Sequence, residues 1–196
     1  MVHGEHENDA IDGFRGARFS RRNAILPGII EHLWGARDQA KRAKRDAMSQ
    51  AIKIIMNSFY GVLGTPGCRF FDLRLVSSIT LRGHAILQTT RDLLESWGYA
   101  VIYGDTDSVF VWLRGEAQTH KVARTGGMLA GRLNAWWRTE VEATAGTVCS
   151  LEVEYETHFR RFLMPRIRGS QAGSKKRYAG LVVDDGIEHI VFKGLE

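Results

Sequence analysis

The sequence predicts an α+β fold in which an antiparallel sheet carries a projecting helical hairpin. Three observations lead to this class. Two helical patterns rich in basic residues follow one another over residues 23–63. Two β-rich runs flank a short acidic turn over residues 99–113, and two more, near 176–183 and 187–193, flank the turn at 184–186. Strands joined by such short turns pair as antiparallel hairpins.

The N-terminal third is expected to hold a linker followed by two helices. Residues 1–22 are polar and lack periodicity, so we expect a flexible loop there. Asn23 is a candidate cap for a first helix that has Pro27 in its first turn. A second helix is expected over 49–63, where apolar residues recur at helical spacing, and the two helices would join near 46–48.

The remaining elements before the final strand pair are a turn, two helices and a strand. A turn-rich segment over 64–72 precedes a third helix, expected over 75–97 and ended by Gly98. A fourth helix is expected from about 118 to 142, and a strand is expected over 151–157.

Charge and composition indicate the kind of partner without naming it. The 196-residue chain has a net charge of +5. Basic residues concentrate before residue 46 and carboxylates cluster later, which suits a phosphate-handling enzyme and equally suits ordinary solvated faces. No apolar run approaches the roughly 18–20 residues of a membrane span. Cys68 and Cys149 form no CxxC pair, which indicates a reducing compartment and no zinc site.

Asp105 and Asp107 flank a single threonine at the tip of the predicted hairpin. Two carboxylates so close together repel each other unless a cation lies between them. Mg²⁺ prefers hard oxygen ligands, commonly one or two carboxylates together with substrate phosphates. The pattern therefore indicates a magnesium site, and a solvated acidic turn is the alternative.

Three ordered motifs resemble those of family B DNA polymerases. They are YGDTDS (103–108) at the hairpin, KIIMNSFYG (53–61) before it and KKRYAG (175–180) after it. The runs CRFFDLRLVSSITLRGH (68–84) and VFKGLE (191–196) are similar to bacterial members of the family. The resemblance covers residues 25–196, and the order of the three motifs makes it specific.

The resemblance implies a polymerase palm, incomplete here and covering 64–196, which carries a fingers hairpin at 23–63 and a linker at 1–22. It implies a DNA-directed DNA polymerase. The reaction would be template-directed nucleotidyl transfer from a dNTP to a primer 3′-hydroxyl, by two-metal catalysis with Mg²⁺ as the cofactor. The partners would be primer–template DNA and, for the full-length enzyme, a sliding clamp, with no membrane. The expected location is the bacterial cytoplasm, in association with the nucleoid.

The resemblance also implies roles for the acidic residues. Asp107 would be the metal ligand that bridges two Mg²⁺ ions, and Asp105 would be a weaker or outer participant. Glu154 would be a third carboxylate near the metals. Glu152, Glu154 and Glu156 would share one face of their expected strand, for which a solvated acidic edge is the alternative.

The two basic helices would hold the nucleotide. Lys53 and Asn57 lie one helical turn apart and share a face. The resemblance implies that both point at the triphosphate and that Lys53 donates a proton to pyrophosphate. Arg37 and Lys41, again one turn apart, would hold the β- and γ-phosphates, and Tyr60 would pack beside the nascent base pair. The alternative is a solvated helix face, against which the poor helix propensity of asparagine argues mildly.

Lys176 and Tyr178 are expected to contact the primer. They alternate along the predicted strand and so would share one of its faces. The resemblance implies that Lys176 contacts the minor groove and Tyr178 the backbone at the primer end.

One part of the family pattern is not found in this sequence. The family's other palm aspartate lies in a segment of the type D-x-x-S-L-Y-P-S, which has no match here. We therefore expect a piece of a larger enzyme that has no polymerase activity alone. Two alternatives stay open: a non-catalytic nucleic-acid-binding module, and another palm-type enzyme such as a reverse transcriptase or a nucleotide cyclase. The motifs at 53–61 and 175–180 argue against the last of these.

Overall fold

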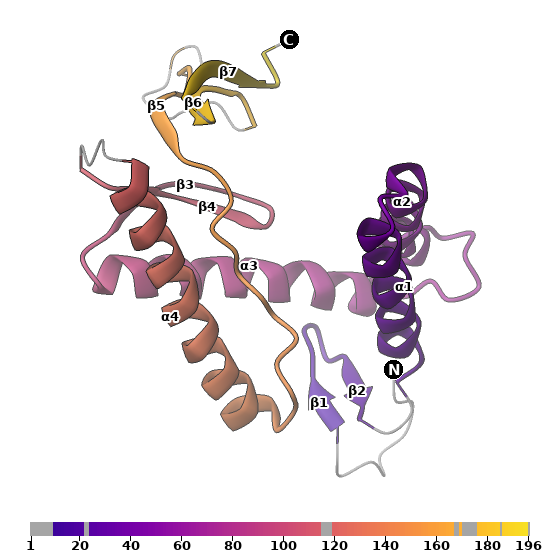
Figure 1. The fold of residues 1–196 in the computed structure, drawn as a ribbon. Coiled ribbons are helices and arrows are strands. Elements are labelled where there is room, and N and C mark those ends of the chain that lie inside the picture. The colour runs from indigo at the N-terminus through magenta and orange to yellow at the C-terminus, as the bar shows by residue number, and fades with distance from the viewer. Residues whose placement is uncertain are drawn as a thin grey trace. The chain divides into compact units, whose positions relative to one another are not determined.

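Helices and small antiparallel sheets make up the protein, which confirms the α+β class (Figure 1). The computed structural model describes residues 10–21, 24–114, 119–166, 169, 176–184 and 186–195. The chain divides into two compact units, Met1–His84 and Ala85–Glu196. No helix in the described part of the chain is both long and apolar enough to cross a membrane. Cys68 and Cys149 are both free thiols.

The first unit contains a β-hairpin close to its start. β1 (Ala10–Asp12) pairs antiparallel with β2 (Arg18–Ser20). The Gly13 N–H donates to the Ala17 carbonyl over 2.8 Å and closes the connection between the strands. The Ala17 side chain is 2% exposed, so the connection is packed against the rest of the unit.

The loop expected over 1–22 is wrong for residues 10–20. Strands of three residues show too little alternation to be recognised in a sequence, and the glycines between them favour a loop. Residues 1–9 and the proposed helix cap Asn23 lie outside the described residues.

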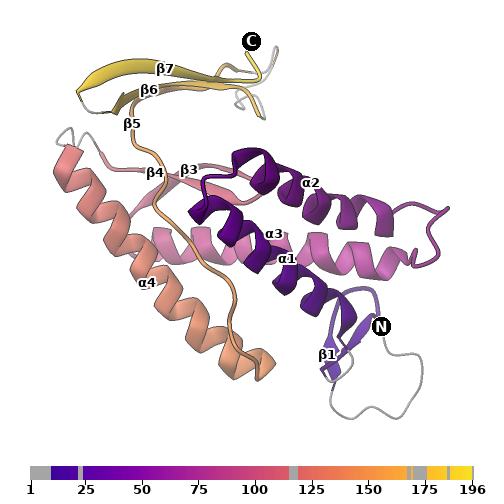
Figure 2. The same cartoon turned by 45° about the vertical axis from the view of Figure 1, so that its right-hand side comes forward.

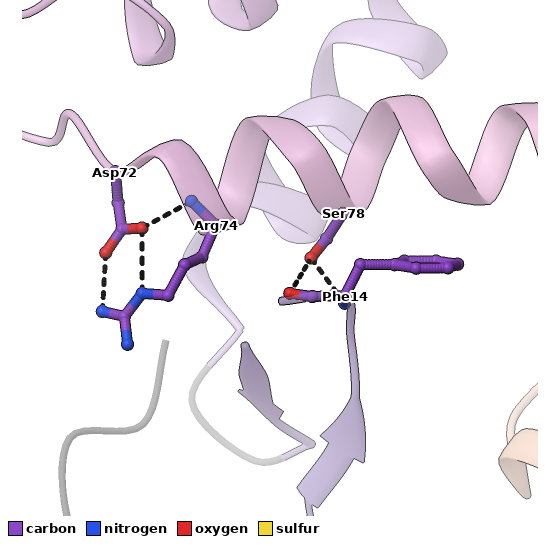
Figure 3. Close-up of polar contacts among 4 residues, drawn as sticks. All are labelled: Phe14, Asp72, Arg74 and Ser78. Carbon is purple, nitrogen blue, oxygen red and sulfur yellow. Dashed lines mark hydrogen bonds and ion pairs between the residues drawn. The ribbon is translucent and has the colours of Figure 1, made fainter. Parts of the chain in front are cut away.

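A buried serine fastens this hairpin to α3 (Leu73–Ser96), as Figure 3 shows. Ser78 Oγ accepts the Phe14 N–H at 2.9 Å and donates to the Phe14 carbonyl at 3.4 Å. One turn further along α3, the Arg82 guanidinium lies 5.2 Å from the centre of the Phe14 ring and donates to the Asp12 carbonyl. Ser78 is 6% exposed, so its hydrogen bonds satisfy polar groups that would otherwise be costly to bury.

α1 (Ile25–Arg42) and α2 (Asp46–Leu63) pack side by side (Figure 2). Their connection is a tight helix-ending motif. Lys44 adopts a left-handed φ of 53°, and the Arg45 N–H donates back to the Ala40 carbonyl at 2.8 Å. The predicted helical hairpin is therefore present in the structure.

α2 begins three residues before the predicted start at 49, so the junction predicted at 46–48 is wrong and lies at 43–45. Asp46 occupies the first turn, where its carboxylate is favoured by the positive end of the helix dipole. The apolar periodicity located this helix but carries no signal for its polar first turn.

Each end of α3 is closed by a recognisable cap. At the start, Asp72 Oδ1 accepts the Arg74 N–H at 2.8 Å. The Arg74 guanidinium then donates to both carboxylate oxygens, at 3.2 and 2.8 Å (Figure 3). At the other end Gly98 adopts a φ of 87° and the Tyr99 N–H donates to the Leu94 carbonyl, which confirms the predicted glycine end.

The second unit is built on α4 (Thr119–Ala145) and on the hairpin of β3 (Ala100–Asp105) and β4 (Ser108–Trp112). Its buried core combines Leu94 of α3 with residues of α4. The members of the core and the partly buried hairpin residues against it are Leu94, Leu129, Leu133, Tyr99, Val101, Val109 and Val111. The predicted hairpin and fourth helix are confirmed.

The last three strands form an antiparallel sheet. β5 (Phe159–Leu163), β6 (Tyr178–Asp184) and β7 (Ile187–Lys193) follow one another in that order. β6 and β7 confirm the predicted strand pair, although β6 begins at Tyr178 and extends to Asp184. The strand predicted over 151–157 is wrong, because that segment is not paired in a sheet and the strand lies at 159–163.

The capping aspartate generates a prediction about acid stability. Hydrogen bonding from Arg74 lowers the pKa of Asp72 from 3.8 to about 2, and the carboxylate is 20% exposed. The folded state therefore binds fewer protons than the unfolded state between these values. Because Arg74 is 43% exposed and water screens the pair, the stabilisation should be no more than about 1 kcal/mol, complete above about pH 5 and lost as the pH falls toward 2.

Urea unfolding across pH 2 to 7 checks this expectation with Asp72→Asn, which keeps a capping oxygen and removes the charge. The variant should be less stable than wild type at pH 7, and the two should converge near pH 2. Asp92→Asn is the matched control, since Asp92 is 62% exposed and its pair with Arg91 should contribute little. Equal losses in both variants at pH 7 would contradict the assignment.

Candidate active site

Only two residues form the tip of the acidic turn between β3 and β4. Asp105 pairs with Ser108 across the turn, which leaves Thr106 and Asp107 between them. Thr106 has a φ of 52°, an uncommon value for a β-branched residue, and the Asp107 N–H donates to the Asp105 carbonyl at 2.6 Å. Strained conformations of this kind persist where the surroundings hold them, often at functional sites.

The two carboxylates differ in their surroundings. The Asp105 side chain is 27% exposed, accepts the Thr106 hydroxyl at 3.0 Å, and lies 4.0 Å from Lys176 Nζ. Asp107 is exposed and accepts the Ser108 hydroxyl at 3.3 Å. Asp107 is therefore more open to a cation, which suits the larger role predicted for it.

Aromatic rings join this hairpin to the C-terminal sheet. Phe110 of β4 lies at the centre, with ring centroids 5.2 to 6.0 Å from those of Tyr103, Phe159, Phe162 and Tyr178. These separations are typical of favourable ring pairs. We call these five residues the aromatic cluster. Through these contacts, the strands that end in the acidic turn pack against the start of β6.

Two β-bulges make the aromatic cluster possible. Side chains two positions apart on a regular strand share a face, so Val101 and Tyr103 would point the same way without the bulge between them. With the bulge, Val101 packs on the helical core and Tyr103 on the sheet. A second bulge in β5 brings Phe159 and Phe162, three positions apart, to the same side.

Gly180 is the last residue of the KKRYAG motif and is buried in β6. A Cβ at this position would collide with the Phe159 ring. Because Phe159 pairs with Val182, Gly180 is its diagonal neighbour across the two strands. The glycine therefore admits one ring of the aromatic cluster onto the strand.

Lys176 does not lie on β6. The strand begins at Tyr178, and Lys176 precedes it in a turn with a φ of 60°. The shared strand face predicted for these two residues is therefore wrong. The Lys176 N–H donates to the Tyr103 hydroxyl oxygen at 2.9 Å, and this contact ties the turn to β3 while the side chain stays 70% exposed.

Tyr178 is half-buried within the aromatic cluster. Burial raises the pKa of its hydroxyl, and Tyr103, Glu156 and Asp105 add smaller increments. The hydroxyl therefore stays protonated at neutral pH and can donate a hydrogen bond to an oxygen acceptor such as a phosphate.

The predicted nucleotide-binding residues lie on α1 and α2 in the first unit. Those with exposed side chains are Lys41, Lys53, Asn57 and Tyr60. Arg37 differs, because its Nε is buried and has no hydrogen-bond partner within the described residues. The acids belong to the second unit, so the approach of Lys53 to Asp107 stays a prediction.

The Tyr60 hydroxyl is held by α3. It lies 2.7 Å from Thr80 Oγ1, and the Thr80 hydroxyl donates to the Val76 carbonyl at 3.1 Å. Because the threonine has a single hydroxyl hydrogen, Tyr60 is the donor of the pair. This contact fixes the tyrosine at the α2–α3 contact within the first unit.

Glu154 lies on the extended segment that precedes β5, and its side chain is exposed. Among the described residues, no three His, Cys, Asp or Glu side chains come close enough to hold a metal ion together. Its membership of the acidic site therefore remains a prediction.

Comparison with known proteins identifies the family. The sequence profile described as DNA polymerase family B matches residues 19–196, which is most of the chain. The chain belongs to DNA polymerase family B. The resemblance inferred from the three sequence motifs is thereby confirmed.

Relatives of this family B chain include bacterial and eukaryotic polymerases. It is 55% identical to DNA polymerase II of Escherichia coli over 185 residues, which is 94% of this chain and 24% of that protein. It is 30% identical to the DNA polymerase alpha catalytic subunit of rice over 90% of this chain and 11% of that protein. The mouse DNA polymerase alpha catalytic subunit is 28% identical over 82% of this chain and 10% of that protein. The chain thus spans a quarter or less of the length of these family B relatives.

The residues that join the acidic turn to the C-terminal sheet are not evident from the sequence. Tyr103 stands out in the sequence only as part of YGDTDS, and Gly180 only as part of KKRYAG. Their neighbours Phe159 and Phe162 are not predicted, because a bulge cannot be read from a single sequence. An aromatic pair at odd spacing beside a strand is the one signal that could have suggested it.

The fit of the ring on Gly180 generates a second prediction. Gly180→Ala should lower the free energy of unfolding by about 1–3 kcal/mol, because the Phe159 ring must move. Gly104→Ala is the control, since a Cβ there meets Leu87 at an ordinary 3.5 Å. That variant should be neutral or more stable by up to about 1 kcal/mol. Urea unfolding followed by near-ultraviolet circular dichroism measures both, and equal effects would reject the packing role.

Proposed function

We propose that this chain is part of a DNA-directed DNA polymerase that transfers a nucleotide from a dNTP to a primer 3′-hydroxyl. The observation that supports this most strongly is the family B match over 19–196 with the Asp105–Asp107 turn intact inside it. The 55% identity to E. coli DNA polymerase II supports the same reaction class. Residues 23–63 would form the fingers and residues 64–196 the core of the palm.

The donor set of the acidic turn fits Mg²⁺. Asp107 and Asp105 offer hard carboxylate oxygens, the ligand type that this ion prefers. Lys176 beside Asp105 offsets part of the negative charge, which leaves Asp107 as the main ligand. When bound, Mg²⁺ supplies charge neutralisation at the attacking hydroxyl and the departing pyrophosphate, by the two-metal chemistry proposed for this site.

The basic residues of α1 and α2 would grip the triphosphate. Arg37 brings a buried donor without a partner among the described residues, and a phosphate oxygen would satisfy it. Lys41 would join it on the β- and γ-phosphates. Lys53 and Asn57 would orient the triphosphate, and the Lys53 ammonium would give its proton to the pyrophosphate as the P–O bond breaks.

The remaining predicted residues would position the primer and the base pair. Tyr60 would pack beside the nascent pair while Thr80 holds its hydroxyl. Tyr178 would donate its hydroxyl hydrogen to the primer backbone, and Lys176 would reach the minor groove. Glu154 would be the third carboxylate. Primer–template DNA is thus the proposed partner, and a sliding clamp and a place at the bacterial nucleoid are proposed for the longer enzyme.

The isolated chain is proposed to be inactive. Two carboxylates at one turn leave a hard ion largely hydrated, and no further cluster of ligands occurs in the described residues. The test therefore places residues 10–195 in E. coli DNA polymerase II in exchange for the matching segment and measures primer extension. The chimera should extend the primer, and the 196-residue chain alone should not.

Asp107→Asn in this chimera should lower kcat by more than about 100-fold, because even the outer partners of metal ligands cost about 10–100-fold when lost. Asp184→Asn, which alters another exposed aspartate at a strand end, is the matched control and should extend normally. Salt-sensitive DNA binding without extension, unchanged by Mg²⁺ and by Asp107→Asn, would instead support a non-catalytic binding module.

A further inference from the structure

The segment before β5 that contains Glu152, Glu154 and Glu156 lies against α4. Asn134 of α4 holds it there. Asn134 Nδ2 donates to the Val153 carbonyl at 2.9 Å, and its Oδ1 accepts the Val153 N–H at 2.8 Å. One side chain thus satisfies both backbone groups that a neighbouring strand would otherwise pair. The Val153 side chain packs on the core beside Leu129 and Leu133.

A glycine notch in α4 provides the second anchor. Gly126 lies about two helical turns before Asn134. A Cβ at Gly126 would collide with the Tyr155 ring, so the ring rests where a side chain would otherwise stand. Gly127, the next residue, has nothing within 4 Å of its Cβ position. Only one glycine of the pair therefore receives the ring.

Two anchors at alternate positions set the direction of the residues between and around them. In an extended chain, successive side chains point to opposite sides. Val153 and Tyr155 contact α4, although Tyr155 is still 38% exposed, and Glu152, Glu154 and Glu156 are all exposed. The segment runs back from the end of α4 toward β5 (Figure 1, orange). The three carboxylates thus belong to an extended segment that packs against a helix, and not to the edge of a sheet.

We propose that Asn134 is a positioning residue for Glu154. Gly126 provides the second contact, because its lack of a side chain leaves room on α4 for the Tyr155 ring. This inference rests on the proposed function, in which Glu154 serves the nucleotidyl-transfer site. Asparagine suits the position because its amide donates and accepts at once. Alanine leaves both Val153 groups without their side-chain partner, and aspartate accepts the N–H while it repels the carbonyl.

Two matched glycine variants of the full 196-residue chain test the contact between Gly126 and Tyr155. Gly126→Ala and Gly127→Ala both raise helix propensity, so neither should loosen α4. Gly126→Ala should shift the Tyr155 ring resonances and lower the hydrogen-exchange protection of the Val153 amide. Gly127→Ala should leave both unchanged. If the Val153 amide loses protection in both variants, or in neither, the proposed contact between Gly126 and Tyr155 does not hold the segment in place.

Variants of Asn134 test its two hydrogen bonds to the Val153 backbone. Asn134→Ala should lower Val153 protection about tenfold, because two hydrogen bonds are lost. In Asn134→Asp, protection should rise as the pH falls and the carboxyl regains a hydrogen to donate. Thr139→Ala, which removes a hydroxyl bonded only within α4, is the control and should match wild type. If the protection of the Val153 amide is independent of pH in Asn134→Asp, the proposed pairing of Asn134 with the Val153 backbone is wrong.

The same variants in the polymerase II chimera separate positioning from folding. Asn134→Ala should lower kcat about tenfold and raise the Mg²⁺ concentration required, with the KM for dNTP nearly unchanged. Lost protection with wild-type kcat and Mg²⁺ dependence overturns the positioning role. An inactive wild-type chimera counts against the proposed function alone. The hydrogen-exchange data then decide by themselves whether Asn134 holds Val153.

Discussion

Packing on both faces of the β3–β4 hairpin determines where the acidic turn can lie. One face carries Val109 and Val111 against the helical core, and the other carries Phe110 into the aromatic cluster. The two-residue turn has a threonine at positive φ, and the packing of both strands is consistent with such a strained conformation. Both aspartates of the motif thus belong to one short turn, where their like charges repel each other.

The aromatic cluster has a second consequence, because it connects the acidic turn to the start of β6. Tyr103 stacks in the cluster through its ring and holds the Lys176 N–H through its hydroxyl. Lys176 is thereby kept within 4.0 Å of Asp105. An exposed ion pair of this kind adds little stability. Its contribution is geometric, since it keeps an exposed ammonium group beside the Asp105 carboxylate.

The sequence located most of the helices and both strand pairs, yet several local features were beyond it, among them the aromatic cluster. Hydrophobic periodicity identified four helices and the acidic hairpin, because those patterns extend over many residues. It could not reveal the bulges beside Tyr103 and Phe159, where one extra residue changes the face of a side chain. The same limit explains Lys176, whose alternation with Tyr178 holds only if the strand begins two residues earlier.

The incorrect strand over 151–157 shows why alternation alone cannot name a partner. A period of two records only that one side of an extended chain is buried. In this protein the buried side meets a helix, and the backbone requirement that a neighbouring strand would satisfy is met at Val153 by one asparagine. A sheet would have fixed the glutamates through a ladder of hydrogen bonds. In this chain the segment meets the helix at two points, the Asn134 hydrogen bonds to Val153 and the contact of Tyr155 with Gly126.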